Sequence, residues 1–279
     1  MSFSNALRRH RRDALVTLVS AGLVAISSSE AVALDHPHHD NGDDDGPLHF
    51  AHPLFTESPS PDTKVRLDYL FRRLTSQGYE HSVRLEAEYA FTPAVSLEAN
   101  VPLTSRSESG TTANSVGSGE IALKLASYAA AERGLLLGGG VAFGVPTGSD
   151  RKAIGSSHLV EVEPYIDAGY KHGETELVTF VSFSTAMHRR ANEGREEAVA
   201  LAISGLQHVA ERVEVLAEFQ SERSVAGGES GRQTASGALG IKYHLGRVHH
   251  LVVGIGGRLP ITRERDSEHE VLLSALWHF

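Results

Sequence analysis

The chain ends in Val271-Leu272-Leu273-Ser274-Ala275-Leu276-Trp277-His278-Phe279, and this stretch decides the fold. Every second residue, counted back from the end, is apolar: Phe279, Trp277, Ala275, Leu273 and Val271. A transmembrane barrel needs a last strand with an apolar outer face and an interfacial aromatic girdle. Pairing of that strand with the first strand removes the free edge of the sheet. The last strand of a soluble sandwich can show the same alternation, so the rest of the chain has to decide.

The first 33 residues have the layout of a secretory signal peptide. Four arginines between residues 8 and 12 form a basic region, residues 14–26 are apolar, and Ala31-Val32-Ala33 is a small-x-small cleavage site. An apolar stretch of about 13 residues is too short to span a bilayer as a helix. We therefore predict that residues 1–33 are a signal peptide, cleaved after Ala33, and that the protein is exported.

Charge and cysteine usage narrow the class of protein. The whole chain has a net charge of −9, and the signal peptide removes more positive than negative charge, so the mature protein is more acidic still. This balance argues against a nucleic-acid partner. Cysteine is absent, so no disulfide holds the exported chain together. After the signal peptide there is no apolar run of ~18 residues, which excludes a helical membrane bundle.

Residues 34–63 are rich in histidine and aspartate and show no hydrophobic period. We expect a disordered or loosely docked periplasmic segment. Closely spaced imidazoles and carboxylates are also ligands for Zn²⁺, Cu²⁺ or Ni²⁺. The candidate metal ligands are His36, His38, His39, His49 and His52, near Asp40, Asp43, Asp44 and Asp45. The alternative is a polar linker that binds no metal.

From Lys64 onward the sequence alternates between apolar and polar residues, which is typical of half-buried strands. Pro164 cannot donate to a ladder, so we expect a bulge or a missing hydrogen bond there. The alternation predicts twelve strands, centred on residues 65–71, 83–91, 95–103, 121–125, 135–145, 160–170, 177–187, 199–203, 213–219, 239–243, 251–259 and 271–279.

The connections between these strands alternate in length. Links near residues 92–94, 130–133, 171–174, 207–211 and 246–248 are shorter than those near 104–117, 146–157, 188–195, 223–231 and 260–268. Short periplasmic turns and longer external loops are typical of outer-membrane barrels, whereas a soluble sandwich does not need this alternation. We predict an all-β protein: a transmembrane antiparallel up-and-down β-barrel of about 12 strands over residues 64–279, located in the outer membrane.

Three short stretches carry a family resemblance. They are Gly117-Ser118-Gly119-Glu120-Ile121-Ala122-Leu123-Lys124, Gly144-Val145-Pro146-Thr147-Gly148 and Leu239-Gly240-Ile241-Lys242-Tyr243. In pattern and order, residues 64–279 resemble the outer-membrane transporter family associated with the meta-pathway of phenol degradation. The resemblance implies a barrel that passes or binds small molecules, including aromatic ones.

The polar positions of the strands are the candidate lining of the lumen. They are Arg66, Asp68, Arg84, Glu86, Glu88, Glu98, Glu120, Lys124, Glu161, Glu163, Asp167, Glu214, Glu218 and Lys242, with His244 beside them. Acidic groups outnumber basic ones, which favours cations or neutral polar solutes in an open pore. A twelve-strand barrel is narrow, so these charges could instead pair with one another and close the lumen.

We predict that the protein is a transporter or porin-like channel for small molecules. A metal-linked barrel that uses the His/Asp-rich segment is the second hypothesis, and an outer-membrane hydrolase is the third. His158, His188 and His269 lie toward the loop side, but no G-x-S-x-G or H-E-x-x-H motif identifies a catalytic residue. We therefore predict no enzyme and no cofactor, apart from the divalent metal left open above. The expected partners are outer-membrane lipids, the barrel assembly machinery and a small-molecule solute.

Overall fold

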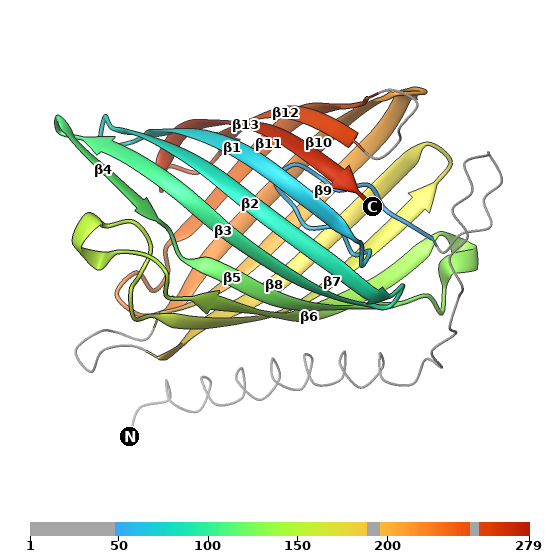
Figure 1. Cartoon of the computed structure of the whole chain (residues 1–279), viewed down its shortest axis with the longest axis horizontal. Coiled ribbons are helices and arrows are strands. Elements are labelled where there is room, and N and C mark those ends of the chain that lie inside the picture. Colours follow the sequence, from blue (N-terminus) through green and yellow to red (C-terminus); the bar gives the residue numbers. More distant parts are fainter. Residues whose placement is uncertain (1–47, 189–195, 246–250) are drawn as a thin grey trace.

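The computed structural model describes residues 48–188, 196–245 and 251–279, and they form a closed antiparallel β-barrel (Figure 1). Twelve strands make the ring, as the alternation predicted, and a short additional strand, β4, pairs only with β3. The strands are β1 (Lys64–Leu74), β2 (Tyr79–Thr92), β3 (Val95–Glu108), β4 (Thr111–Val116), β5 (Gly119–Ser127), β6 (Leu135–Val145), β7 (Val160–His172), β8 (Thr175–His188), β9 (Glu197–Ala210), β10 (Val213–Ala226), β11 (Gln233–His244), β12 (Leu251–Pro260) and β13 (Ser267–His278).

The first and last strands close the barrel. β1 pairs with β13 in an antiparallel register that runs from Lys64 opposite His278 to Arg73 opposite His269. Beyond this ladder, the Phe279 N–H donates to the Thr63 carbonyl at 3.0 Å. Closure satisfies the backbone polar groups that an open edge would leave unpaired, which is the condition for a sheet to stand in lipid.

The two faces of the sheet differ as the alternation requires. Leu85, Leu103 and Leu239 lie on the outer face, exposed by 54%, 56% and 71%, while the alternate positions point inward and carry the charged side chains. On β13, Trp277 is 48% exposed and the terminal Phe279 is 67% exposed, and their rings stack at 6.1 Å. The predicted apolar outer face of the last strand is therefore confirmed. No helix within the described ranges has the length and apolar character of a membrane span.

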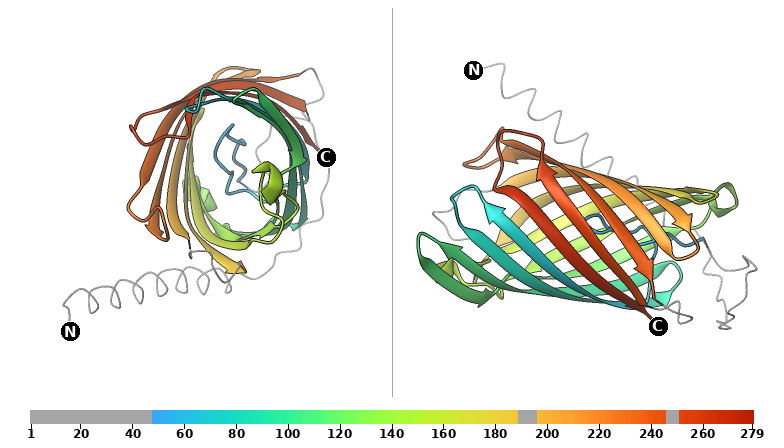
Figure 2. Two further views of the ribbon diagram at one scale, coloured as in Figure 1. Left: turned by 90° about the vertical axis from the view of Figure 1, so that its left-hand side faces the viewer. Right: turned by 90° about the horizontal axis from the view of Figure 1, so that it is seen from above.

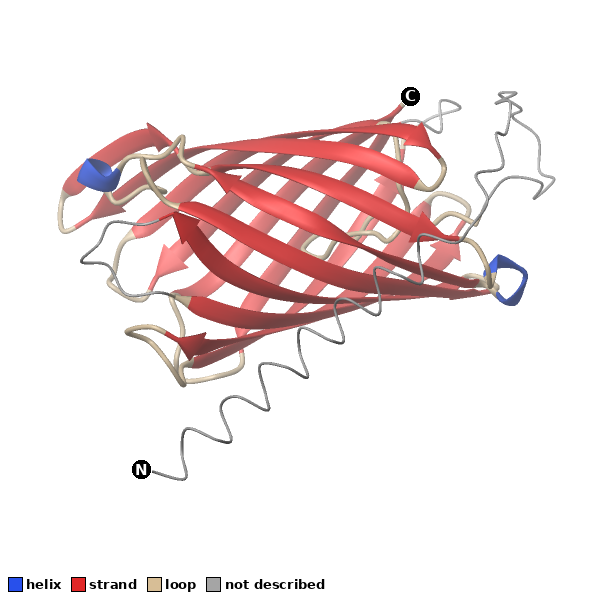
Figure 3. Ribbon diagram, turned by 90° about the horizontal axis from the view of Figure 1, so that it is seen from below, coloured by secondary structure: helices blue, strands red, loops and turns tan. Residues whose placement is uncertain are grey.

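The connections differ between the two ends of the barrel. At one end the turn between β2 and β3 is tight, and a two-residue turn at Gly173-Glu174 joins β7 to β8. At the other end, residues 104–117 were predicted as a loop, and this is wrong in part: β3 continues to Glu108 and pairs with β4, extending the sheet as a hairpin. Two short 3-10 helices, η1 (Ala131–Arg133) and η2 (Asp150–Lys152), lie at opposite ends (Figure 3).

Pro164 interrupts one ladder and leaves the register unchanged. Val162 faces Thr185 and Tyr165 faces Ser182, which is the same register on both sides of the proline, but no pair to β8 forms at Glu163 and Pro164. On its other side Pro164 lies opposite Val141 of β6. Of the two alternatives expected from the sequence, the structure shows the missing pairing and not a bulge at this position.

Residues 48–63 lie inside the barrel (Figure 2). Phe50 and Leu54 are buried, and so are Pro53, Pro59 and several polar residues between them. The prediction of a disordered or loosely docked periplasmic segment is therefore wrong for residues 48–63, which are buried and hydrogen-bonded to the wall. An irregular segment can pack without a hydrophobic period when the wall around it accepts its backbone hydrogen bonds. The predicted signal peptide and residues 34–47 lie outside the described residues.

Candidate functional site

The sequence-predicted lining residues all occupy inward positions of the strands. Those that are buried are Arg66, Asp68, Glu86, Glu88, Glu98, Lys124, Asp167, Glu214, Glu218 and Lys242. Those that are half-buried are Arg84, Glu120, Glu161, Glu163 and His244. Several further inward charges were missed from the sequence, although the same alternation would have found them: Lys64, Glu80, Glu176, Glu222, Arg258 and Glu270.

Two lysines organise a group of carboxylates in the interior. The Lys64 Nζ lies 3.1 Å from Glu86 and 3.0 Å from Glu88, and Glu98 is within 3.9 Å. The Lys124 Nζ contacts Glu88 at 3.3 Å. Because these side chains are almost fully buried, each charge depends on its partner for stabilisation. The structure thus brings together predicted lining residues from β2, β3 and β5, through one lysine that the sequence pattern had not singled out.

A second group of ions surrounds Asp68 on β1. The Arg66 Nε donates to one carboxylate oxygen at 2.9 Å, and the Arg84 guanidinium donates to the other at 2.7 Å. The Arg66 Nη2 also donates to the Leu54 carbonyl of the N-terminal segment at 2.6 Å. Arg66 therefore connects the wall of the barrel to the segment inside it.

Carboxylates of the wall bind the backbone of the N-terminal segment. Glu218 on β10 accepts from the N–H groups of Leu54 and Phe55, both at 3.0 Å. Glu176 on β8 accepts from the Ala51 N–H at 2.8 Å, and Glu88 accepts from the Asp62 N–H at 3.1 Å. These charge-assisted bonds satisfy N–H groups that a segment without secondary structure would otherwise leave buried and unpaired. We call residues 48–63 the plug.

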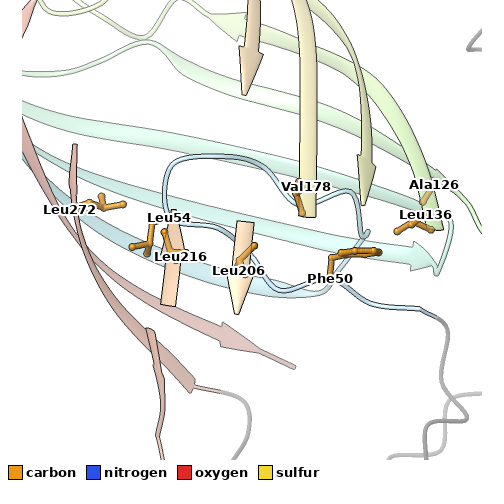
Figure 4. Packing of buried hydrophobic residues seen from close by; sticks show 8 residues of the cluster. All are labelled: Phe50, Leu54, Ala126, Leu136, Val178, Leu206, Leu216 and Leu272. Carbon is orange, nitrogen blue, oxygen red and sulfur yellow. The ribbon is translucent and has the colours of Figure 1, made fainter. Parts of the chain in front are cut away.

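Two apolar side chains of the plug pack against the wall (Figure 4). Phe50 and Leu54 belong to one buried cluster with Ala126, Leu136, Val178, Leu206, Leu216 and Leu272 of the strands. Glycines make room for them: a Cβ at Gly169 would lie 2.7 Å from the Phe50 ring, and a Cβ at Gly254 would lie 2.7 Å from Leu54. These inward glycines therefore leave the space that the plug occupies.

A cavity of about 450 Å³ lies between the plug and the end of the barrel that carries the longer loops. Phe55, Thr56 and Glu57 of the plug line it on one side. The charged residues around it are six carboxylates and four arginines: Glu57, Glu163, Glu222, Glu264, Asp266, Glu270, Arg72, Arg106, Arg258 and Arg265. We call this cavity the vestibule.

Three arginines of the vestibule are held in ion pairs. Arg106 bonds to Glu80 at 2.7 Å, Arg72 lies 3.3 Å from both Glu80 and Glu270, and Arg258 bonds to Glu270. The Arg258 guanidinium also lies over the Phe55 ring, 4.9 Å from its centroid. Three of the four arginines thus share two carboxylates, Glu80 and Glu270. Counted with Glu80, the carboxylates around the vestibule still outnumber its four arginines, so its net charge is negative.

Histidines gather at the opposite end of the barrel interior. His49, His52 and His278 surround Asp62, with ring nitrogens 3.1, 3.1 and 2.7 Å from its Oδ2. Burial and the nearby Lys64 charge lower the pKa of His52 well below its ordinary value. Burial by itself would raise the pKa of Asp62, but the hydrogen bonds from the three histidines outweigh it and lower that pKa far below its usual range. The other predicted metal ligands, His36, His38 and His39, lie outside the described residues.

Among the described residues, Asp150, Ser156 and His158 are not arranged as a hydrolase triad. Asp150 and Ser156 both approach Nδ1 of His158, at 3.0 and 3.3 Å. A triad needs the nucleophile and the orienting carboxylate on different ring nitrogens. His269 packs beside Phe71, with ring centroids 6.0 Å apart, and the side chain of His188 is not among the described ones.

Fold and interior together define the class of protein. A closed antiparallel barrel with an apolar outer surface, a charged interior and terminal aromatic residues facing outward is an outer-membrane β-barrel. Its outer surface is therefore in contact with lipid.

Solved structures with a similar fold include outer-membrane channels and porins. An outer membrane channel from Pseudomonas putida F1 matches with a TM-score of 0.62 and 14% identity, over 85% of this chain and 100% of that one. The NanC porin matches with a TM-score of 0.53 and 12% identity, over 78% of this chain and 98% of that one. The KdgM porin matches with a TM-score of 0.51 and 9% identity, over 77% and 99%. At these identities the likeness shows a shared fold.

Sequence comparison does not assign the chain to a family. No family model matches the chain, and no curated protein matches it either. The resemblance to the outer-membrane transporters of the phenol meta-pathway therefore stays a prediction.

Proposed function

We propose that the protein is a porin-like outer-membrane channel for small molecules, and that the plug closes its lumen. The observation that carries this proposal is the composition of the interior, where charged side chains surround a segment held mainly by hydrogen bonds. A barrel that served only as a membrane anchor would gain nothing from buried charges, because well-packed apolar residues of similar volume are as stabilising or more so. The likeness of the fold to solved channels and porins supports the same function.

The vestibule indicates the class of solute. Its six carboxylates, with Glu80 behind them, outnumber its four arginines, so its net charge is negative. This favours neutral or cationic molecules over anions. The phenyl rings of Phe55 and Phe180 also line the vestibule. Arg258 covers one face of the Phe55 ring, and Phe180 stacks on Tyr165 with ring centroids 5.0 Å apart. The remaining ring surface is apolar and aromatic, which fits the aromatic solutes that the family resemblance implies.

Solute uptake into proteoliposomes tests this proposal. Liposomes that contain the mature protein, or a variant lacking residues 34–61, are placed in isotonic lysine, phenyl glucoside or glutamate, and the rate of swelling is measured. The shortened variant should admit lysine and phenyl glucoside faster than glutamate, and the mature protein should admit them more slowly than the variant. Swelling no faster than that of empty liposomes for both proteins would mean a sealed barrel.

A further inference from the structure

Three histidines and one aspartate meet where the first and last strands join. His49 and His52 come from the plug, Asp62 lies two residues before β1, and His278 is the last residue of β13. One donor atom from each side chain can be chosen so that all four lie within 4.8 Å of one another. Imidazole nitrogens and a carboxylate oxygen are the ligands that Zn²⁺ takes in four-coordinate sites.

The spacing of the four groups approaches that of a tetrahedral site. The ring nitrogens lie 3.1, 3.1 and 2.7 Å from Asp62 Oδ2. With bonds of roughly 2.0–2.1 Å to a central ion, ligand atoms at the corners of a tetrahedron lie about 3.3 Å apart. The three edges that meet at Oδ2 are thus shorter than this value by about 0.2, 0.2 and 0.6 Å, and the remaining separations are within 4.8 Å.

Hydrogen bonding alone accounts poorly for the arrangement. A carboxylate oxygen offers about two lone pairs, yet three imidazole nitrogens point at the same Oδ2. The other oxygen, Oδ1, accepts the Thr63 N–H at 2.8 Å. A cation between the rings and the carboxylate would use all four groups without overloading one oxygen.

The backbone already holds the ligands in place. Thr63 and Phe279, the neighbours of Asp62 and His278, are joined by a backbone hydrogen bond of 3.0 Å. His52 is buried, with 2% of its side chain exposed, while the side chain of His49 is 49% exposed. The cluster therefore has one face fixed in the barrel and one face open to an ion from the periplasm.

We propose that His49, His52, Asp62 and His278 form a binding site for a divalent transition-metal ion of the Zn²⁺ type. In the structure, Nδ1 of His52 lies 3.2 Å from the Lys64 ammonium. Binding of the metal through Nε2 places the imidazole proton on Nδ1, so Lys64 has to turn away from the ring. Lys64 keeps Glu86 and Glu88 as partners, at 3.1 and 3.0 Å, when it turns away from the ring. The ion joins residues near both ends of the plug to the last strand of the barrel.

Titration of the purified mature protein with Zn²⁺ tests this site. Isothermal calorimetry should show one ion per chain with a dissociation constant tighter than about 10 μM. His278→Ala and His49→Ala should each weaken binding by at least ~100-fold, because each removes a direct ligand. His49 lies outside the strands, so its variant keeps the test valid if His278→Ala impairs folding. Mg²⁺ should give no signal, since it prefers oxygen ligands.

Two control variants separate this site from other histidines. His172→Ala removes an exposed histidine at the end of β7 and should leave binding unchanged. A variant with His36, His38 and His39 all changed to alanine should also keep it. Co²⁺ bound to the wild type should show the strong visible absorption of a tetrahedral site, and this should be lost in His278→Ala. Absence of Zn²⁺ binding, or binding that survives both His49→Ala and His278→Ala, would overturn the proposal.

Discussion

Glu218 on β10 accepts the backbone N–H of Leu54 at 3.0 Å, and so joins the wall of the barrel to the middle of the plug. The same carboxylate accepts the Phe55 N–H at 3.0 Å. Two N–H groups of an irregular segment thus depend on one acidic side chain that is itself buried. The closed state of the lumen therefore relies on particular wall residues as well as on the bulk of the segment.

Replacing Glu218 by alanine should loosen the plug and spare the barrel. A hydrogen bond to a charged group contributes about 1.5–3 kcal/mol, so the displaced state should become at least ~10-fold more populated. Limited proteolysis between residues 48 and 61 measures this population. Glu120→Ala is a matched control, because Glu120 is a half-buried carboxylate that accepts a hydrogen bond from Asn100 of the wall at 3.1 Å. Equal cleavage of the two variants would count against the role given to Glu218.

Gly254→Ala should displace Leu54, because the added Cβ would lie 2.7 Å from its Cδ2. The expected cost is about 1–3 kcal/mol of plug stability, as for overpacking of a core. Leu54→Ala should suppress the effect in the double variant, since it removes the clashing methyl group. Hydrogen exchange of the plug amides measures the stability of the plug in the wild type, in each single variant and in the double variant. Gly205→Ala is the control, because a Cβ there would meet nothing within 4 Å. Additive effects of the two substitutions would contradict the proposed contact.

Deleting Phe279 should impair assembly in the outer membrane. The residue ends the chain, is 67% exposed on the lipid side and stacks on Trp277. We also expect the barrel assembly machinery to act on this last strand. The measurement is the fraction of heat-modifiable, folded barrel in outer-membrane preparations. Leu259→Ala, which shortens an apolar side chain 61% exposed near the end of β12, should have little effect. Normal amounts of folded barrel after the deletion would contradict the prediction.

Carboxylates that line the vestibule should affect ion selectivity, whereas a carboxylate buried in an ion pair should affect the stability of the barrel. Neutralising Glu163 and Glu222, which line the vestibule, should lower cation preference in a variant lacking residues 34–61. The reversal potential in a salt gradient measures this change. Glu86→Gln should instead destabilise the barrel by about 3 kcal/mol, because it removes a buried partner of Lys64. Anion preference before any substitution would show that the charge of the vestibule has been misjudged.

Alternation was enough to predict the barrel wall. In the predicted strands, a residue that faces lipid must be apolar and its neighbour can be polar, so the inward side chains such as Glu86 and Lys124 could be assigned from parity. The hairpin of β3 and β4 was missed because its residues are polar on both faces outside the lipid. Alternation carries no signal where no face is buried in lipid.

The plug and the histidine cluster were harder to predict because they depend on contacts between distant segments. Phe50 and Leu54 stand among prolines without any period, and their pockets are formed by Gly169 and Gly254, far away in the sequence. His49 and His52 were candidate metal ligands from composition. Asp62 and His278 were not, because only closure of β1 on β13 brings the two ends of the barrel domain together.

Single-channel recording in planar bilayers tests the central claim, that the plug closes an otherwise open lumen, most directly. The mature protein and the variant lacking residues 34–61 are compared at the same voltage and salt concentration, after heat-modifiability has shown that both are folded. We predict rare or brief openings for the mature protein and a sustained, cation-preferring conductance for the variant. Equal conductance of the two proteins, or no conductance from either, would contradict the claim.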